Sequence, residues 1–144
     1  MPVKYEQLLN ENPQATTIVM EYVEGSVDDE ANLEAARLVR LNKLNTLVPG
    51  DGLIASGGTD FFLAGLKRTI KEGAQIGVHS WAGFGIDDAS KLPRTDPEHQ
   101  EHLQYYKEMG IPADFYWYTL EAAPSDDIHW MTQEEIKRYK VATP

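Results

Sequence analysis

Ser56 and His79 are the residues of this chain whose types and positions best suit nucleophilic chemistry. Ser56 ends a short apolar run, Leu53 to Ala55, and His79 follows twenty-three residues later at the end of a second apolar run, Gln75 to Val78. A serine hydroxyl becomes a nucleophile when a histidine takes its proton. The two side chains therefore predict a nucleophile and its general base, presented by neighbouring elements.

The stretch around Ser56 predicts a strand, a sharp turn and a helix. Two glycines follow the serine and allow the backbone to turn sharply. Thr59 and Asp60 then occupy N-cap positions, which predicts a helix from about Thr59 to Arg68. The amides at the start of such a helix point back toward the serine, where they could bind an anion.

A serine hydrolase of this kind needs a third group, because the histidine must be held in one tautomer. Asp126 and Asp127 are the candidates, in a turn just before the last predicted helix. The alternative is that these two aspartates only cap or start that turn. Spacing alone leaves both interpretations open.

Strands alternate with helices along the chain. The predicted elements are a buried strand at 16–23, a helix at 28–41, a short strand at 46–48, the two apolar strands named above, and helices at 96–109, from 111 and from Thr132, which forms a capping box with Glu135. This alternation predicts βαβ units, a mainly parallel sheet and an α/β fold class. Ligands gather at the carboxyl ends of such strands, where Ser56 and His79 are expected.

Composition limits the partners. The 144 residues predict an N-terminal extension over 1–15 and a single domain over 16–144. A net charge of -10 argues against nucleic acid and anionic membranes as partners, since phosphate binding needs clustered Lys and Arg. Cysteine is absent, which excludes disulfides and a thiol nucleophile. Because Met1 to Gln14 lacks the pattern of a secretory signal, the chain is expected in the cytoplasm if complete, or in the periplasm if a signal was removed.

Several short motifs resemble the proteolytic subunit of Clp protease and its relatives, above all the small ClpP-like proteins predicted to be periplasmic. They are Gly25-Ser26 after a strand, Ala55-Ser56-Gly57-Gly58 opening a helix, Gly77-Val78-His79, and the ending from Asp127 to Glu135 followed by Tyr139. Their order and separations agree over roughly residues 16 to 142. The resemblance implies a ClpP/crotonase-like fold of ββα units.

The resemblance also assigns roles to individual residues. Ser56 resembles the nucleophile of the family and His79 its general base. Asp127 resembles the acid that orients the base, and Asp126 is the neighbour that a shift of one residue would select instead. No cofactor and no metal is implied.

Two further features follow from the resemblance. The amide of Gly57 and one from the turn of Gly25 and Ser26 resemble an oxyanion hole. The helix from Asp96 to Met109 resembles the projecting handle of the family, which takes part in assembly. A homo-oligomer, as a trimer, hexamer or ring, is therefore expected.

Three functions are compatible with these residues. The first is a serine hydrolase that acts on peptide or ester bonds; it would work without ATP, because no docking segment for an unfoldase is recognisable. The second is a catalytically inactive assembly or binding module, since Glu24-Gly25-Ser26 departs from the usual proline and two glycines of the oxyanion turn. The third is a crotonase-like enzyme acting on acyl thioesters.

Two other clusters have simpler interpretations. His99 and His102 could share a metal ion, but a solvated helix face is the favoured prediction. The aromatic residues could line a substrate groove, but packing in the core or at a subunit contact is favoured. These aromatic residues are Trp81, Phe84, Phe115, Tyr116, Trp117, Tyr118 and Trp130.

Overall fold

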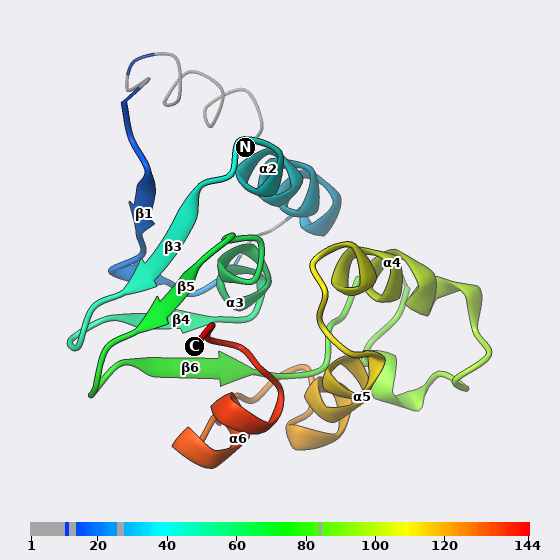
Figure 1. Cartoon of the computed structure of the whole chain (residues 1–144). Helices are drawn as coiled ribbons and strands as arrows, with labels where there is room; N and C mark the ends of the chain where they lie inside the picture. The colour runs from blue at the N-terminus through cyan, green and yellow to red at the C-terminus, as the bar shows by residue number, and fades with distance from the viewer. Residues whose placement is uncertain (1–10, 12–13, 26–27, 84) are drawn as a thin grey trace.

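The strands of the chain form two small sheets (Figure 1). They come in successive pairs along the sequence, and a helix follows each of the first two pairs. The computed structural model describes residues 11, 14–25, 28–83 and 85–144. The predicted extension over residues 1–15 lies mostly outside these residues. The first unit is β1 (Thr17–Val19), β2 (Tyr22–Val23) and α2 (Asp29–Leu41), the second is β3 (Asn45–Val48), β4 (Leu53–Ala55) and α3 (Gly57–Phe62), and the third begins with β5 (Arg68–Ile70) and β6 (Gln75–Val78).

Each unit contributes one strand to each sheet. One sheet has the order β1-β3-β5, and its strands are all parallel. The other has the order β2-β4-β6-β7, in which only β7 (His129–Trp130) runs antiparallel to its neighbour. Mainly parallel strands alternating with helices confirm the predicted α/β class. In the second sheet Ala55 pairs with Gly77, so the strands that carry Ser56 and His79 lie side by side.

Helix α2 shows why these elements pack as they do. Asp28 caps the helix by accepting a hydrogen bond from the Ala31 amide. The buried side chains recur at helical spacing along one face, which joins the common hydrophobic core. They are Asn32, Leu33, Ala35, Ala36 and Val39.

Apart from β7, the regular elements that the structure describes after β6 are helices. They are η1 (Ala89–Lys91), η2 (Pro97–His99), α4 (Gln100–Glu108), α5 (Ala113–Ala122) and α6 (Gln133–Arg138). Figure 1 shows α4 and α5 to the right of the sheets, beyond the end of β6. The helix predicted as a handle corresponds to η2 and α4, and the inner face of α4 buries His102, Tyr105 and Tyr106.

The structure corrects two predicted elements and confirms a third feature. The strand expected at 16–23 is divided into β1 and β2, which belong to different sheets, and Tyr22 is 66% exposed rather than buried. The helix expected from Thr59 to Arg68 begins instead at Gly57 and ends at Phe62, and Arg68 starts strand β5. The capping box of Thr132 and Glu135 is confirmed.

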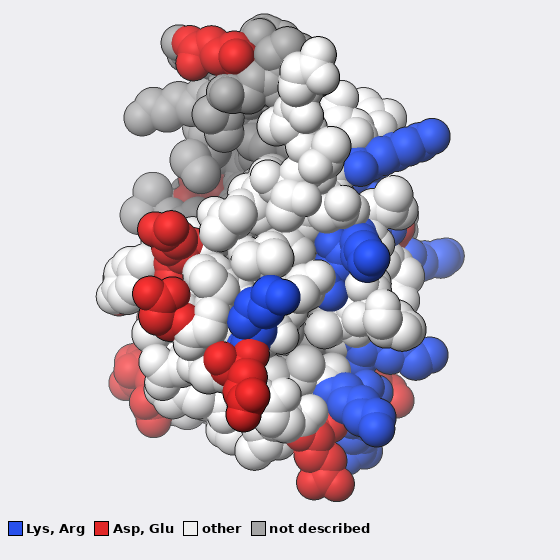
Figure 2. All heavy atoms as spheres, turned by 60° about the vertical axis from the view of Figure 1, so that its left-hand side comes forward, with Lys and Arg blue, Asp and Glu red and all other residues white. Residues whose placement is uncertain are grey.

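Charge is unevenly distributed over the surface. Figure 2 shows a face on which most Lys and Arg side chains gather toward one side and several Asp and Glu side chains toward the other. None of the helices in the described part of the chain combines the length and apolar character that a bilayer span requires.

Gly58 provides a test of how closely β2 and α3 are packed. A Cβ atom at this position would lie 2.3 Å from the Val23 carbonyl oxygen, which belongs to rigid backbone. We therefore expect Gly58→Ala to lower the free energy of unfolding by about 2 kcal/mol, as overpacking does in other cores. Urea denaturation would measure the loss. Gly83→Ala is the control, because no atom lies within 4 Å of its Cβ position, and equal losses in both variants would contradict the argument.

Candidate functional site

Ser56 stands at a strained turn between β4 and α3. Its backbone has φ 55° and ψ -121°, in the region that residues other than glycine rarely adopt. Such a conformation costs about 1–3 kcal/mol and persists only where the surroundings enforce it. It places the serine at the N-cap position of α3 rather than in the strand, so the side chain stands at the carboxyl end of the sheet.

Neighbouring elements hold this turn in place. The carbonyl oxygen of Gly77 in β6 accepts hydrogen bonds from the Ser56 amide at 3.3 Å and from the Thr59 hydroxyl at 2.7 Å. The side-chain amide of Asn32, which is buried in α2, donates to the Gly57 carbonyl at 2.9 Å. A sheet neighbour and a helix thus fix the position of the nucleophile.

His79 follows the last residue of β6, and its ring contacts the loop after α5. The Nδ1 atom lies 3.1 Å from the backbone carbonyl oxygen of Ser125. Because a carbonyl oxygen only accepts hydrogen bonds, Nδ1 must carry the hydrogen. In the neutral ring the lone pair is then on Nε2, which is the tautomer that a general base requires.

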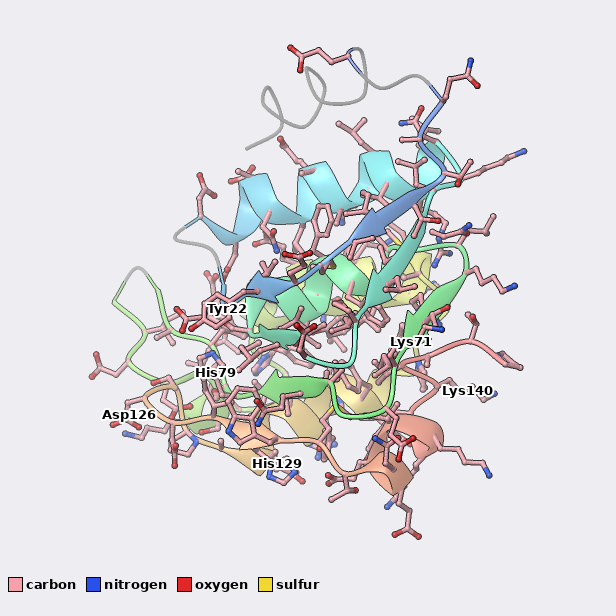
Figure 3. The ribbon with its side chains drawn as sticks, turned by 90° about the vertical axis from the view of Figure 1, so that its left-hand side faces the viewer. Tyr22, Lys71, His79, Asp126, His129 and Lys140 are labelled. Atoms are coloured by element: carbon pink, nitrogen blue, oxygen red, sulfur yellow. The ribbon has the colours of Figure 1, made fainter. Side chains whose placement is uncertain are left out.

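The predicted acid is not the partner of His79. Asp127 is exposed, and its Oδ1 accepts a hydrogen bond from the Ile128 amide at 2.8 Å. Asp126 is also exposed, and Figure 3 shows it on the loop at the same end of the molecule as His79. The structure thus differs from the expected triad, because the loop turns a peptide carbonyl rather than a carboxylate toward the imidazole.

A buried carboxylate fixes the loop that carries this carbonyl. Asp88 is 7% exposed, and its Oδ2 accepts a hydrogen bond from the Ser125 amide at 3.0 Å. Its Oδ1 accepts from the Ser90 amide at 2.9 Å and from the Ser90 hydroxyl at 2.6 Å. Burial raises the pKa of Asp88, but the hydrogen bonds from Ser80, Ser90 and Ser125 outweigh it and hold that pKa well below its usual range. Asp88 therefore stays ionised and anchors Ser125.

The turn after β2 lies against the serine. A Cβ built on Gly25 would lie 3.5 Å from Ser56 Oγ and 3.7 Å from the Gly57 nitrogen. Gly57 is the first residue of α3, so its amide has no acceptor within the helix. The other predicted oxyanion residue, Ser26, lies outside the described residues. Gly25 thus lies close to Ser56 and Gly57.

Ser56 and His79 line one pocket of about 30 Å³. No hydrogen bond joins their side chains among the residues that the structure describes, and such contacts often tighten only when substrate binds. Asp60 also lines the pocket, and its Oδ1 accepts a hydrogen bond from the Tyr106 hydroxyl at 2.5 Å. Burial raises the pKa of Asp60 to about 7, although the hydrogen bond from Tyr106 lowers it and the charge of Asp29 raises it further.

His102 forms another wall of the pocket and is not on a solvated face. It is 6% exposed, and its ring stacks with the rings of Trp81 and Tyr116 at centroid distances of 5.5 and 5.7 Å. Burial, followed by the charge of His99, lowers the pKa of His102 to about 4, so the ring is neutral at pH 7. The solvated helix face that the sequence suggested is therefore wrong.

His99 is also buried, and both its nitrogens are occupied. Nε2 lies 3.1 Å from the Pro93 carbonyl, which only accepts, so Nε2 carries the hydrogen. In the neutral ring Nδ1 then accepts a hydrogen bond from the Tyr116 hydroxyl at 2.6 Å, and that hydroxyl accepts in turn from Trp81 Nε1 at 2.9 Å. Over the described part of the chain, no group of three His, Asp or Glu side chains is arranged to hold a metal ion.

The aromatic residues divide between core and pocket. Phe115 and Tyr116 are buried in the core, as favoured, but Tyr116 and Trp81 also line the pocket. Trp130 is 40% exposed, and Phe84 lies outside the described residues.

Sequence reasoning missed Asp60, Asp88 and Ser125 as parts of the site. Asp60 could have been found, because it lies four residues after Ser56 and a short helix brings such residues to one face. Asp88 and Ser125 gave no such signal, since they lie on two loops that only the tertiary fold brings together.

Comparison with solved structures identifies the fold. Two variants of 1510-N, a membrane-bound stomatin-specific protease, resemble this chain. One carries a lysine-to-alanine change and a bound substrate peptide; it matches with a TM-score of 0.59 at 19% identity, over 99% of this chain and 68% of that chain. The other carries a serine-to-alanine change and matches with a TM-score of 0.59 at 18% identity, over 99% and 72%.

This chain has a ClpP-like fold. At this level of identity the likeness concerns the ClpP-like fold alone. No family model matches the sequence, and neither does any curated protein.

The raised pKa of Asp60 predicts a change of stability with pH. Its pKa lies near 7 in the folded state against 3.8 ordinarily, so the protonated carboxyl favours folding below about pH 4 and this contribution is lost as the pH rises through 7. In Asp60→Asn this loss should be absent. Urea denaturation at pH 5 and pH 8 should show a larger fall for the wild type than for the variant.

The comparison isolates Asp60, because His102 titrates in both proteins. Asp114→Asn, at an exposed position of α5, is the matched control and should behave like the wild type. Parallel pH profiles for the wild type and Asp60→Asn would contradict the assignment.

Proposed function

We propose that the protein is a serine hydrolase of the peptidase type, with Ser56 as nucleophile and His79 as general base. The observation that carries the proposal is the strained Ser56 turn, which faces the same pocket as an imidazole whose tautomer is fixed by the Ser125 carbonyl. Backbone strain at a polar residue in a pocket is typical of catalytic sites. The ClpP-like fold, which this chain shares with a protease, supports the same conclusion.

The reaction would proceed through an acyl-enzyme. Ser56 Oγ attacks the substrate carbonyl carbon while its proton passes to His79 Nε2. His79 then gives this proton to the leaving amine or alcohol as the bond to carbon breaks. Water repeats the sequence with His79 as base, which releases the acid and restores the serine. The Gly57 amide, with the turn at Gly25, would stabilise the oxyanion.

The orienting group in this proposal is the Ser125 carbonyl, and Asp88 holds that carbonyl in place. A carbonyl dipole fixes the tautomer of His79 as a carboxylate would, but it carries no full charge. It therefore stabilises the imidazolium less. In this proposal the backbone contact takes the role that the predicted triad gives to Asp127, or to Asp126 as the alternative.

The first test is covalent labelling. A fluorophosphonate probe should modify the wild-type protein, forming a bond from Ser56 Oγ to phosphorus with loss of fluoride. Ser56→Ala should abolish labelling, and His79→Gln should slow it by at least about 100-fold, the usual contribution of a general base. Mass spectrometry of the labelled peptide locates the site. An unlabelled wild-type protein would favour the inactive binding module or the acyl-thioester enzyme instead.

A second test separates the backbone arrangement from the expected triad. Asp127→Ala and Asp126→Ala should label as fast as the wild type, because neither side chain contacts His79. Asp88→Ala should slow labelling by about tenfold or more, since His79 loses its oriented partner. The Nδ1 proton signal of His79, measured by NMR, should weaken in Asp88→Ala alone. Fast labelling of Asp88→Ala together with slow labelling of Asp127→Ala would restore the triad.

A further inference from the structure

The pocket beside Ser56 has a polar character that the hydrolytic step does not require. Asp60 and His102 line it together with Trp81, Tyr106 and Tyr116. The Nδ1 atom of His102 is buried and has no hydrogen-bond partner among the described residues. A buried ring nitrogen left unpaired costs free energy unless a ligand supplies the partner.

The hydroxyl groups of the wall are already committed as donors. Their hydrogen bonds run from Thr59 to the Gly77 carbonyl at 2.7 Å, from Thr119 to the Tyr116 carbonyl at 2.6 Å, from Tyr106 to Asp60 at 2.5 Å and from Tyr116 to His99 at 2.6 Å. The hydroxyl of Ser56 is not counted, because the reaction uses it as the nucleophile. What the wall has left to offer is the carboxyl of Asp60 and the ring of His102, and both groups can donate as well as accept a hydrogen bond. A complementary ligand group must therefore be able to do both, as a hydroxyl can.

The size of the pocket restricts this group further. A volume of about 30 Å³ holds roughly one or two water molecules. A hydroxymethyl group fits such a space, whereas a leucine or phenylalanine side chain does not. The stacking of His102 with Trp81 and with Tyr116 fixes the wall, so enlargement would break two aromatic contacts.

The position of the pocket identifies which part of a substrate enters it. Ser56 and His79 are themselves on its wall, so a group inside it lies within a few bonds of the attacked carbonyl carbon. The side chain on the residue that supplies this carbonyl satisfies that condition.

We propose that the pocket binds this side chain and selects a short one that ends in a hydroxyl, as in serine. The inference rests on the proposed hydrolase function and names the class of substrate at the same site.

Peptidyl phosphonate diphenyl esters test the selection. These probes form a bond from Ser56 Oγ to phosphorus with loss of phenol, and the side chain next to phosphorus can be that of serine, alanine, 2,3-diaminopropionic acid, leucine or phenylalanine. On the wild type, the serine probe should react at least about tenfold faster than the alanine probe, because only its hydroxyl can pair with Asp60 and His102. The leucine and phenylalanine probes should be the slowest.

His102→Phe is the diagnostic variant, since it keeps the stacked ring and removes both nitrogens. It should react with the serine probe no faster than with the alanine probe. Tyr118→Phe is the matched control, because it removes another buried polar atom, one that lies outside the pocket wall. This control should keep the wild-type preference.

The outcomes separate the two proposals. Equal rates for the serine and alanine probes on the wild type would overturn the selection, and fluorophosphonate labelling of Ser56 would still support the hydrolase. A faster reaction with the diaminopropionic acid or leucine probe would also overturn it. No labelling of Ser56 by either kind of probe would overturn both proposals.

Discussion

The close packing of β2, α3 and β6 around Ser56 is the constraint on which the candidate site depends. The Gly77 carbonyl receives two donors from the turn, and the Val23 carbonyl leaves no room for a side chain at Gly58. These contacts compensate for the unfavourable backbone conformation of Ser56, which would otherwise relax. Gly77 itself has no space for a Cβ, which would lie 2.7 Å from Ile128 Cγ2. The position of the nucleophile is therefore a property of the sheet.

The base is positioned in another way, by loops rather than by strands. His79 leaves β6 and meets the Ser125 carbonyl, and Ser125 is bonded in turn to the carboxylate of Asp88. The charged carboxylate of Asp88 therefore does not contact the imidazole and acts on it only through Ser125. Such a site combines a well-defined tautomer with weaker electrostatic support than a direct carboxylate provides.

The sequence was informative where local pattern determines structure. The apolar runs before Ser56 and His79, the helix after Asp28 and the capping box of Thr132 could all be predicted from side-chain type and spacing. The division of residues 16–23 between two sheets could not, because the crossover at Met20 and Glu21 carries no turn residue.

The hydrogen-bond partner of His79 could not be predicted from the sequence for a related reason. Two acidic side chains follow Ser125 in the sequence, and chemistry favours a carboxylate behind a catalytic histidine. The loop conformation decides which atom faces the ring, and it is set by Asp88, thirty-seven residues earlier. Buried hydrogen bonds between distant loops produce no periodic pattern of residue types in a sequence. The role of a backbone carbonyl is still harder to foresee, since every residue has one.

The way in which each strand pair is shared between the sheets has a consequence for unfolding. The strands are only two to four residues long, too short to form stable ladders by themselves. Because successive strands alternate between the sheets, one unit cannot detach without opening both of them. Local fraying is therefore suppressed between β1 and β6. Slowly exchanging backbone amides in this region should exchange only when both sheets open together.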